Sequence, residues 1–207
     1  MIIIPWNEIM TPASLDKIRC CVLADGVLAY PTDTLYGLGG NFFSLALMAK
    51  VDRMKDRRDM PYSVAVANLL MLESLAVGIP PIFYSGLWDL LPGKFTFLFA
   101  ASPAIDPLLL KNSGKIGIRL PGLTPLLRLI EKIGLPLVST SVNRSGRPPL
   151  NDPAQIAAEF PGINLLIDGG VLPLSNGSTV VDLGAARPRL VRAGDDAKKF
   201  GVFLAGT

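Results

Sequence analysis

The chain has 207 residues, enough for one large domain with its own core, and 50% of them are hydrophobic. It contains no histidine and only two cysteines. Histidine-based acid–base catalysis, the usual zinc sites and a disulfide framework are therefore excluded. A formal net charge of +3 is only mildly basic, so it leaves RNA binding open without indicating it.

The apolar composition does not indicate a membrane protein. A spanning helix needs about 20 predominantly apolar residues. The longest stretch without a charge, residues 34–49, is shorter and contains three glycines. The first six residues lack the basic region and apolar core of a secretion signal. Together with the adjacent pair Cys20 and Cys21, this favours a soluble protein of the reducing cytoplasm.

Helical periodicity occurs at four places along the chain, namely residues 12–24, 42–57, 123–133 and 152–159. Short polar side chains accept hydrogen bonds from the first amides of a helix. We therefore expect Asn41 to cap the second helix, and Asn151 or Asp152 to cap the fourth. The residues after Gly194 are expected to form a short closing helix.

Apolar runs typical of strands occur between these helices, and glycine or proline stands at nearly every junction. The expected strands are residues 26–30, 62–67, 95–100, 116–120, 135–140, 164–168, 179–183 and 189–191. No linker marks a second domain. The sequence therefore predicts a single α/β (α+β) domain over residues 1–207, built on a twisted, largely buried sheet flanked by helices.

A hydroxyl-rich turn follows the first of these strands, at residues 31–40. Thr32 and Thr34 alternate, so both side chains can face one side of the turn, and the glycines after them let a ligand approach the backbone. A Thr/Asp turn with a glycine-rich connection explains the same residues without a ligand. Asp33 is interpreted as a turn or cap residue and not as a catalytic base.

A basic run ends the second predicted helix. The helix dipole explains a solvated cluster of Lys50, Arg53 and Arg58 at a helix C-terminus without invoking a ligand. Lys55 and Arg57 differ, because a proline and a buried-type strand follow at once and return the chain to the sheet. These two cations are expected near the edge of the sheet, where they suit phosphate groups.

A third polar segment follows the strand over residues 135–140. Its short hydrogen-bonding side chains are Ser139, Thr140, Ser141, Asn143 and Ser145. Ligands of open α/β sheets collect at the carboxyl ends of strands. Without a histidine no Ser-His-Asp triad can form, so these serines would bind and not attack. A purely structural serine turn remains an alternative.

Two arginines raise a further ambiguity. Arg192 ends an apolar strand close to a glycine, and Arg119 lies in the segment Ile-Gly-Ile-Arg-Leu-Pro-Gly. Each suits either a phosphate clamp or a surface salt bridge. The hydroxyls of Ser178 and Thr179 form a fourth cluster. No Walker A loop or G-x-G-x-x-G fingerprint occurs, so nucleotide binding cannot rest on those motifs.

Taken together, these segments resemble the YrdC-type threonylcarbamoyl-AMP synthases, in the family's order over about residues 10–195. The matching motifs are Pro-Thr-Asp-Thr-x-Tyr-Gly-Leu at 31–38, Lys-x-Arg-x-x-x-Pro at 55–61, Pro-Gly-x-x-Thr at 92–96, Gly-x-Arg-x-Pro at 117–121, Thr-Ser-x-Asn-x-Ser-Gly at 140–146, Ser-Thr-Val-Val-Asp at 178–182 and Arg-x-Gly at 192–194. The resemblance implies a YrdC-like fold with a basic concave cleft, in the short form without an extra C-terminal domain.

The resemblance also implies a reaction, in which L-threonine, bicarbonate and ATP give threonylcarbamoyl-AMP and pyrophosphate. The product would feed the N6-threonylcarbamoyl modification of adenosine 37 in tRNA, through a downstream threonylcarbamoyl transferase. Mg²⁺ is expected to arrive on the ATP phosphates, because no carboxylate cluster suggests metal-ligating residues in the protein. Direct binding of tRNA or double-stranded RNA is left open.

Residue roles follow from the motifs and their chemistry. Lys55 and Arg57 are the expected catalytic cations. The expected ATP-binding residues are Lys55, Arg57, Ser139, Ser141, Asn143 and Arg192. The expected threonine-binding residues are Thr32, Thr34, Arg119, Ser178 and Thr179.

The chain departs from the family pattern at Asp56, Arg58, Lys94 and the pair Tyr62-Ser63. Lys94 stands where proline is frequent. These changes bear on substrate preference and rate more than on fold. Two other functions remain open. One is a carbamoyl-adenylate-forming paralogue, like the related domain of hydrogenase-maturation carbamoyltransferases, and the other is an RNA-binding module of the same fold.

Overall fold

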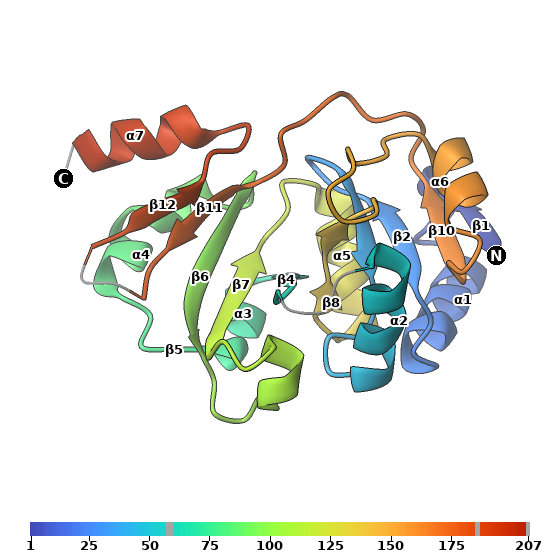
Figure 1. The fold of residues 1–207 in the computed structure, drawn as a ribbon, viewed down its shortest axis with the longest axis horizontal. Coiled ribbons are helices and arrows are strands. Elements are labelled where there is room, and N and C mark those ends of the chain that lie inside the picture. The colour runs from blue at the N-terminus through green and yellow to red at the C-terminus, as the bar shows by residue number, and fades with distance from the viewer. Residues whose placement is uncertain (57–59, 185–186, 206–207) are drawn as a thin grey trace.

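Two β-sheets lie side by side in the computed structural model, which describes residues 1–56, 60–184 and 187–205 (Figure 1). Sheet A has the order β1-β10-β2-β3-β9, formed by Ile2–Pro5, Leu165–Asp168, Leu28–Pro31, Tyr36–Gly39 and Thr140–Ser141. Sheet B has the order β12-β11-β6-β7-β4-β8, formed by Arg189–Arg192, Thr179–Asp182, Phe95–Ala101, Lys115–Arg119, Ser63–Ala65 and Leu137–Val138. A short β5, Ala76–Val77, pairs with β6.

Both sheets are mixed. In sheet A, β1, β10 and β2 are parallel, whereas β3 runs antiparallel to β2 and β9 antiparallel to β3. In sheet B, β11 is parallel to β6 and β4 is parallel to β7, while the β11–β12, β6–β7 and β4–β8 pairs are antiparallel. The predicted α/β fold with a mixed sheet flanked by helices is confirmed.

Between β8 and β9 the chain passes from sheet B to sheet A within one residue, Ser139. The sheets meet closely there, since Val138 N donates to Gly40 O at 2.8 Å. A Cβ atom on Gly39 would lie only 1.9 Å from Val138 O. The glycine run therefore lets two backbones approach each other. The strand predicted over 135–140 is thus split into two short ones, one for each sheet.

Helices cover the outer faces of the sheets (Figure 1). The α-helices are α1 Pro12–Leu23, α2 Leu45–Lys55, α3 Leu69–Leu75, α4 Pro81–Ser85, α5 Thr124–Ile133, α6 Pro153–Glu159 and α7 Ala197–Ala205. Three 3₁₀ turns are η1 Trp6–Glu8, η2 Leu87–Leu90 and η3 Pro107–Leu110. The sequence missed α3, α4, β1, β3 and β5, while α7 confirms the predicted closing helix. No helix in the described ranges is long and apolar enough to cross a membrane.

Polar caps define where several helices begin. Thr11 Oγ1 accepts from Ser14 N at 3.3 Å, Ser44 Oγ from Leu47 N at 3.0 Å, and Asp152 Oδ1 from Ala154 N at 2.8 Å. Each bond satisfies an amide that the first helical turn leaves without a partner. The prediction of Asp152 as the cap of α6 is confirmed.

The predicted cap Asn41 is wrong, because Ser44 occupies the position before α2. The Asn41 backbone still pairs with Leu137 in a β-bridge, so the chain is extended there. Its side chain accepts a hydrogen bond from Phe43 N at 3.0 Å within the turn that follows. The helix consequently starts three residues later than periodicity predicted, at Leu45.

Two hydrophobic cores lie in this framework. The larger is rich in aromatic residues, with the Phe83 ring edge-on to Phe97 and Phe99 at centroid distances of 5.5 and 5.2 Å. The smaller joins α1 to α5 through residues at helical spacing, including Ile18 and Leu129, which are fully buried. Packing of these apolar faces fixes the helices on the sheets, and it leaves the polar strand ends free to form the site.

Candidate active site

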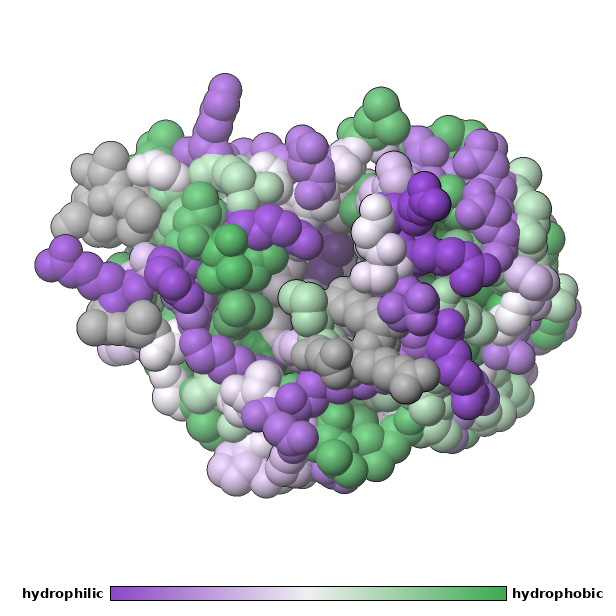
Figure 2. All heavy atoms as spheres, in the orientation of Figure 1, coloured by the Kyte–Doolittle hydropathy of each residue, from purple (hydrophilic) through white to green (hydrophobic). Residues whose placement is uncertain are grey.

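A cleft of about 580 Å³ opens between the two sheets. Its lining comes from residues 34–37, 60–63, 139–141 and 175–178, together with Leu98, Arg119, Pro149, Val180, Val191 and Arg192. Figure 2 shows the hollow near the centre of the face. Segments 31–36, 55–61, 139–145 and 178–179, which carry the predicted site residues, each contribute at least one residue to this lining. In segment 55–61 the contributing residues are Met60 and Pro61, and Lys55 does not line the cleft.

The turn after β2 presents its two threonines together. Thr32 Oγ1 and Thr34 Oγ1 lie 3.1 Å apart, and Thr32 Oγ1 donates to Leu35 O at 2.7 Å. Arg119, at the end of β7, donates to Thr34 Oγ1 from both terminal nitrogens at 3.3 Å. Thr34 and Arg119 line the cleft, whereas Thr32 lies behind them and supports the turn.

Asp33 has a role that sequence reasoning missed. Its carboxylate forms an ion pair with Arg119 and accepts a hydrogen bond from Gly122 N at 2.8 Å. Both side chains of the pair are less than a tenth exposed. Asp33 therefore orients the guanidinium, while Arg119 Nε is buried without a hydrogen-bond partner among the described residues. The rest of the Arg119 guanidinium carries the charge that the cleft presents to a ligand.

A second hydroxyl group comes from the start of β11. Ser178 Oγ lies 2.7 Å from Thr96 Oγ1 on β6, and Arg192 Nη2 donates to Ser178 O at 2.9 Å and to Ser178 Oγ at 3.2 Å. Ser178 and Arg192 line the cleft. Thr179 is fully buried outside the lining, and its Oγ1 accepts a hydrogen bond from Gly194 N at 3.2 Å.

The two arginines influence each other across the cleft. Burial, and then the positive charge of Arg119, lower the pKa of Arg192. No carboxylate occurs among the described residues that line the cleft. Two guanidiniums in such surroundings favour a bound anion, because an anion relieves their mutual repulsion.

Lys55 is buried at the end of α2 and faces the chain after β9. Its ammonium donates to Ser141 O at 2.5 Å, to Asn143 O at 2.9 Å and to Asn143 Oδ1 at 2.9 Å. Ser141 Oγ also donates to Asn143 Oδ1, at 2.6 Å. Of these three residues, only Ser141 lines the cleft. Lys55 thus supports the wall from behind, and direct contact with a phosphate would require it to exchange one of these acceptors.

Ser139 stands where the chain crosses between the sheets, and it lines the cleft. The neighbouring Tyr30 is fully buried and donates to Val138 O at 2.8 Å. Burial raises the pKa of Tyr30 to about 12, although the nearby Ser139 side chain and the charge of Arg119 oppose the shift. Ser139 and Tyr30 are therefore part of the buried junction between the sheets.

The predicted site residues divide into three groups. Those that line the cleft are Thr34, Arg119, Ser139, Ser141, Ser178 and Arg192. Those that lie directly behind it are Thr32, Lys55, Asn143 and Thr179. Arg57 lies outside the described residues.

Ser175 and Asn176 line the cleft but were missed, because they belong to no motif and lie in the irregular connection between β10 and β11. Gly177, which follows them at a positive φ, was the one local signal of a tight turn. Among the residues that the structure describes, no group of three His, Cys, Asp or Glu side chains could hold a metal ion.

A family model described as telomere recombination, for the Sua5, YciO and YrdC proteins, matches residues 21–194. The match covers most of the chain, so the chain belongs to the Sua5/YciO/YrdC family. The resemblance expected from the sequence motifs is confirmed.

Two curated relatives show how much of the chain is shared. A threonylcarbamoyl-AMP synthase of Pyrococcus abyssi is 31% identical over 184 residues, which are 86% of this chain and 53% of the relative. One of Coxiella burnetii is 29% identical over 172 residues, which are 82% of this chain and 92% of the relative. The chain therefore spans about half the length of the archaeal relative and nearly all of the bacterial one.

Two solved structures share the fold. The crystal structure of P. abyssi Sua5 complexed with L-threonine matches with a TM-score of 0.84 and 28% identity, covering 93% of this chain and 57% of that one. The structure of Escherichia coli YciO matches with a TM-score of 0.82 and 24% identity, covering 94% of this chain and 96% of that one.

Proposed function

We propose that this chain is an L-threonylcarbamoyladenylate synthase, a nucleotidyltransferase that makes threonylcarbamoyl-AMP and pyrophosphate from L-threonine, bicarbonate and ATP. The observation that carries the proposal is the cleft in which Arg119 and Arg192 stand beside the hydroxyls of Thr34 and Ser178. Relatives named threonylcarbamoyl-AMP synthase support it. The complex of a relative with L-threonine supports it further.

The threonine would bind at the turn after β2. The Arg119 guanidinium, which lines the cleft, suits its carboxylate, and the hydroxyls of Thr34 and Ser178 suit its β-hydroxyl and amine. Thr32 and Thr179 would hold these groups in place from behind. Asp33 would keep the Arg119 guanidinium turned toward the ligand.

The triphosphate would bind where Arg192, Ser139 and Ser141 line the cleft. Arg192 offers a charged donor and the serines offer hydroxyls, which together suit phosphate oxygens. Lys55 and Asn143 would fix the Ser141 turn and add positive charge close to the phosphates. We keep Arg57 as a proposed phosphate-binding and catalytic residue on its sequence motif alone.

The reaction would proceed in two steps. Bicarbonate gives CO2 and hydroxide. The threonine nitrogen attacks the carbon of CO2, forms an N–C bond and loses a proton, which the hydroxide takes up as water, and an anionic carbamate results. A carbamate oxygen then attacks the α-phosphorus of ATP, and the bond to the bridging oxygen breaks as pyrophosphate leaves with that electron pair. Both steps need positioning and charge neutralisation more than a strong base. A chain without histidine can provide both.

Mg²⁺ would enter with the ATP phosphates. Protein sites for Mg²⁺ use carboxylate oxygens, and the described residues that line the cleft include no carboxylate. The lining therefore does not fit a resident Mg²⁺ site, and its hydroxyls and guanidiniums would contact the phosphates instead. The product would pass to a threonylcarbamoyl transferase acting on tRNA in the cytoplasm. We keep tRNA or double-stranded RNA as a proposed direct partner.

The test is pyrophosphate release by the purified chain with L-threonine, bicarbonate and ATP, omitting each substrate in turn, with the adenylate identified by mass. We expect release only when all three are present. Release with carbamoyl phosphate in place of threonine and bicarbonate would favour the carbamoyl-adenylate alternative. No release with either set, together with tight RNA binding, would favour a binding module.

A further inference from the structure

One wall of the cleft is formed by a segment that crosses between the sheets. This strap (residues 169–178) connects β10 of sheet A to β11 of sheet B (Figure 1). Its last four residues, Ser175 to Ser178, line the cleft. Leu172 packs against the larger core, but Leu174, the residue directly before the lining end, is 94% exposed. Something other than hydrophobic packing must therefore fix the lining end of the strap.

The first end of the strap is tied to sheet A. The Tyr36 hydroxyl accepts from Gly169 N at 2.9 Å and donates to Gly170 O at 2.8 Å. Leu172 exchanges two hydrogen bonds with Asn151, at 2.9 and 2.6 Å. These contacts end before the residues that line the cleft begin.

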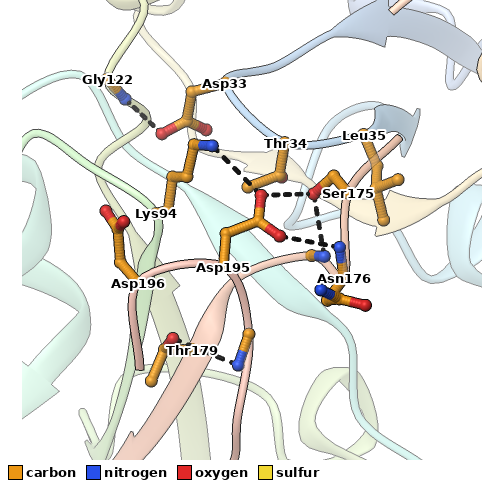
Figure 3. A network of polar contacts seen from close by, with 12 residues as sticks. Asp33, Thr34, Leu35, Lys94, Gly122, Ser175, Asn176, Thr179, Asp195 and Asp196 are labelled. Atoms are coloured by element: carbon orange, nitrogen blue, oxygen red, sulfur yellow. Dashed lines mark hydrogen bonds and ion pairs between the residues drawn. The ribbon is translucent and has the colours of Figure 1, made fainter. Parts of the chain in front are cut away.

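The second end is tied to Asp195, which follows β12. Its carboxylate accepts from Asn176 N at 2.8 Å, from Ser175 Oγ at 2.8 Å and from Lys94 Nζ at 3.1 Å. Figure 3 shows all three donors pointing toward this one carboxylate. Burial raises the pKa of Asp195, but the hydrogen bonds from Ser175, Asn176 and Lys94 outweigh it and lower that pKa below its usual value.

The backbones of the two segments also touch. Asp195 N donates to Gly177 O at 3.0 Å, and a Cβ on Gly194 would lie 2.3 Å from Gly177 O. Arg192, three residues before Asp195, donates to Ser178 O at 2.9 Å. The lining end of the strap and the Arg192 guanidinium are thus joined into one unit.

Lys94 connects this unit to the middle of sheet B. It directly precedes β6, and its carbonyl accepts from Thr179 N at 2.8 Å. Two residues on, Thr96 contacts Ser178. The sequence marked Lys94 as a departure from the family pattern without giving it a role, and the geometry gives it a specific partner, Asp195.

We propose that Lys94 and Asp195 form a latch that holds the lining end of the strap, together with Arg192, as a fixed wall of the cleft. Asp195 is then a positioning residue for the ligands that Ser178 and Arg192 contact. The identity of those ligands, threonine and ATP, rests on the proposed function. The existence of the latch does not rest on the proposed function.

The test uses three variants and one matched control. Lys94→Met removes the ion pair, Lys94→Arg retains it, and Asp195→Ala removes every contact of the carboxylate. Lys115→Met is the control, because Lys115 is similarly exposed and pairs with the buried Asp182 of β11 at 2.8 Å, away from the strap. Hydrogen exchange at the strap amides and the separate KM and kcat values are measured for each variant.

We expect exchange at the amides of Asn176 and Gly177 to speed up roughly tenfold or more in Asp195→Ala, since charged hydrogen bonds are lost. A partly exposed ion pair contributes less, so Lys94→Met should give about a two- to fivefold increase. The KM for threonine and ATP should rise by similar factors with kcat changed less. Lys94→Arg and Lys115→Met should leave strap exchange and both KM values near those of the unmodified chain.

The latch proposal is overturned if hydrogen exchange at the strap amides is no faster in Asp195→Ala and Lys94→Met than in Lys115→Met. Faster exchange with unchanged KM values would overturn the positioning role. If the unmodified chain releases no pyrophosphate, the proposed function fails, while the exchange measurements still decide the latch. If Asp195→Ala does not fold, the Lys94 pair of variants carries the test.

Discussion

Arg119 and Asp33 form a buried ion pair that joins the end of β7 to the turn after β2. Gly122 N donates to the same carboxylate at 2.8 Å, so the end of β7 and the residues directly after it both hold Asp33. The pair explains why the guanidinium faces Thr34. An interpretation of Asp33 as a simple turn residue is therefore incomplete.

This ion pair predicts that substitutions at Asp33 and Arg119 have strongly coupled effects on the free energy of unfolding. Asp33→Ala should cost about 3–5 kcal/mol, because removing one partner leaves a buried charge uncompensated. The Asp33→Ala, Arg119→Ala double variant should lose much less than the sum of the two single variants. Urea unfolding of the four proteins gives the coupling energy. Strictly additive losses would mean that the two side chains do not depend on each other.

Two cations of α2, Lys55 and Arg53, are expected to differ in their effect on ATP binding. Lys55→Ala removes three hydrogen bonds behind the cleft wall, and charge-assisted bonds contribute about 1.5–3 kcal/mol each. We therefore expect the KM for ATP to rise roughly tenfold or more. Arg53→Ala, at an exposed position of the same helix, is the control and should change little. If Lys55→Ala and Arg53→Ala change the steady-state KM for ATP by equal, small amounts, Lys55 is only part of a basic helix end.

The hydroxyls of the proposed threonine site predict which amino acid the protein prefers as substrate. Thr34 Oγ1 contacts both Thr32 and Arg119, so Thr34→Val should raise the KM for threonine while leaving the KM for ATP nearly unchanged. A site that pairs a hydroxyl rejects analogues that lack it, whereas one methyl group is worth only about 1–3 kcal/mol. We expect threonine to be preferred over serine, with 2-aminobutyrate and valine poorer still. Competition assays with the four amino acids give the order, and a preference for valine would contradict this site.

The buried tyrosines predict an alkaline limit to stability. Burial raises the pKa of Tyr30 to about 12, and burial followed by the charges of Asp168 and Asp152 raises that of Tyr36 to about 12, from a usual 10.0. A raised pKa in the folded state means that the stabilisation is full below about pH 10. It is lost as the pH rises through about 12.

Unfolding free energies measured from pH 8 to 12 by denaturant titration should therefore fall through this window. In Tyr30→Phe the decline should be shallower, because one of the two groups no longer ionises. An identical decline in this variant would contradict the assignment to Tyr30.

Local patterns predicted the elements that bury one face. α5 was placed to within one residue, because its apolar side chains repeat at helical spacing. The strand β1 was not predicted, since it becomes a strand through β10, a partner far along the chain. β3 was not predicted either, because two of its four residues are glycines, although it pairs with the neighbouring β2 as well as with the distant β9.

The sequence predicted the site residues that depend on local geometry, and it missed the contacts that depend on distant segments. Alternation placed Thr32 and Thr34 on one side, because that geometry is local. The partners of Asp33 and Lys55 lie 86 and 88 residues away, so no window of sequence could indicate those bonds. The role of Asp195 was not predicted for the same reason, because its contacts depend on how the strap crosses between the sheets.

The close approach of Gly39 to Val138 has a consequence for how such sequences diverge. The spacing between the two sheets is set by backbone against backbone, with no side chain in between. Substitutions in either core can therefore change packing without moving one cleft wall relative to the other. We therefore expect relatives near 30% identity to retain this backbone spacing even where their core residues differ.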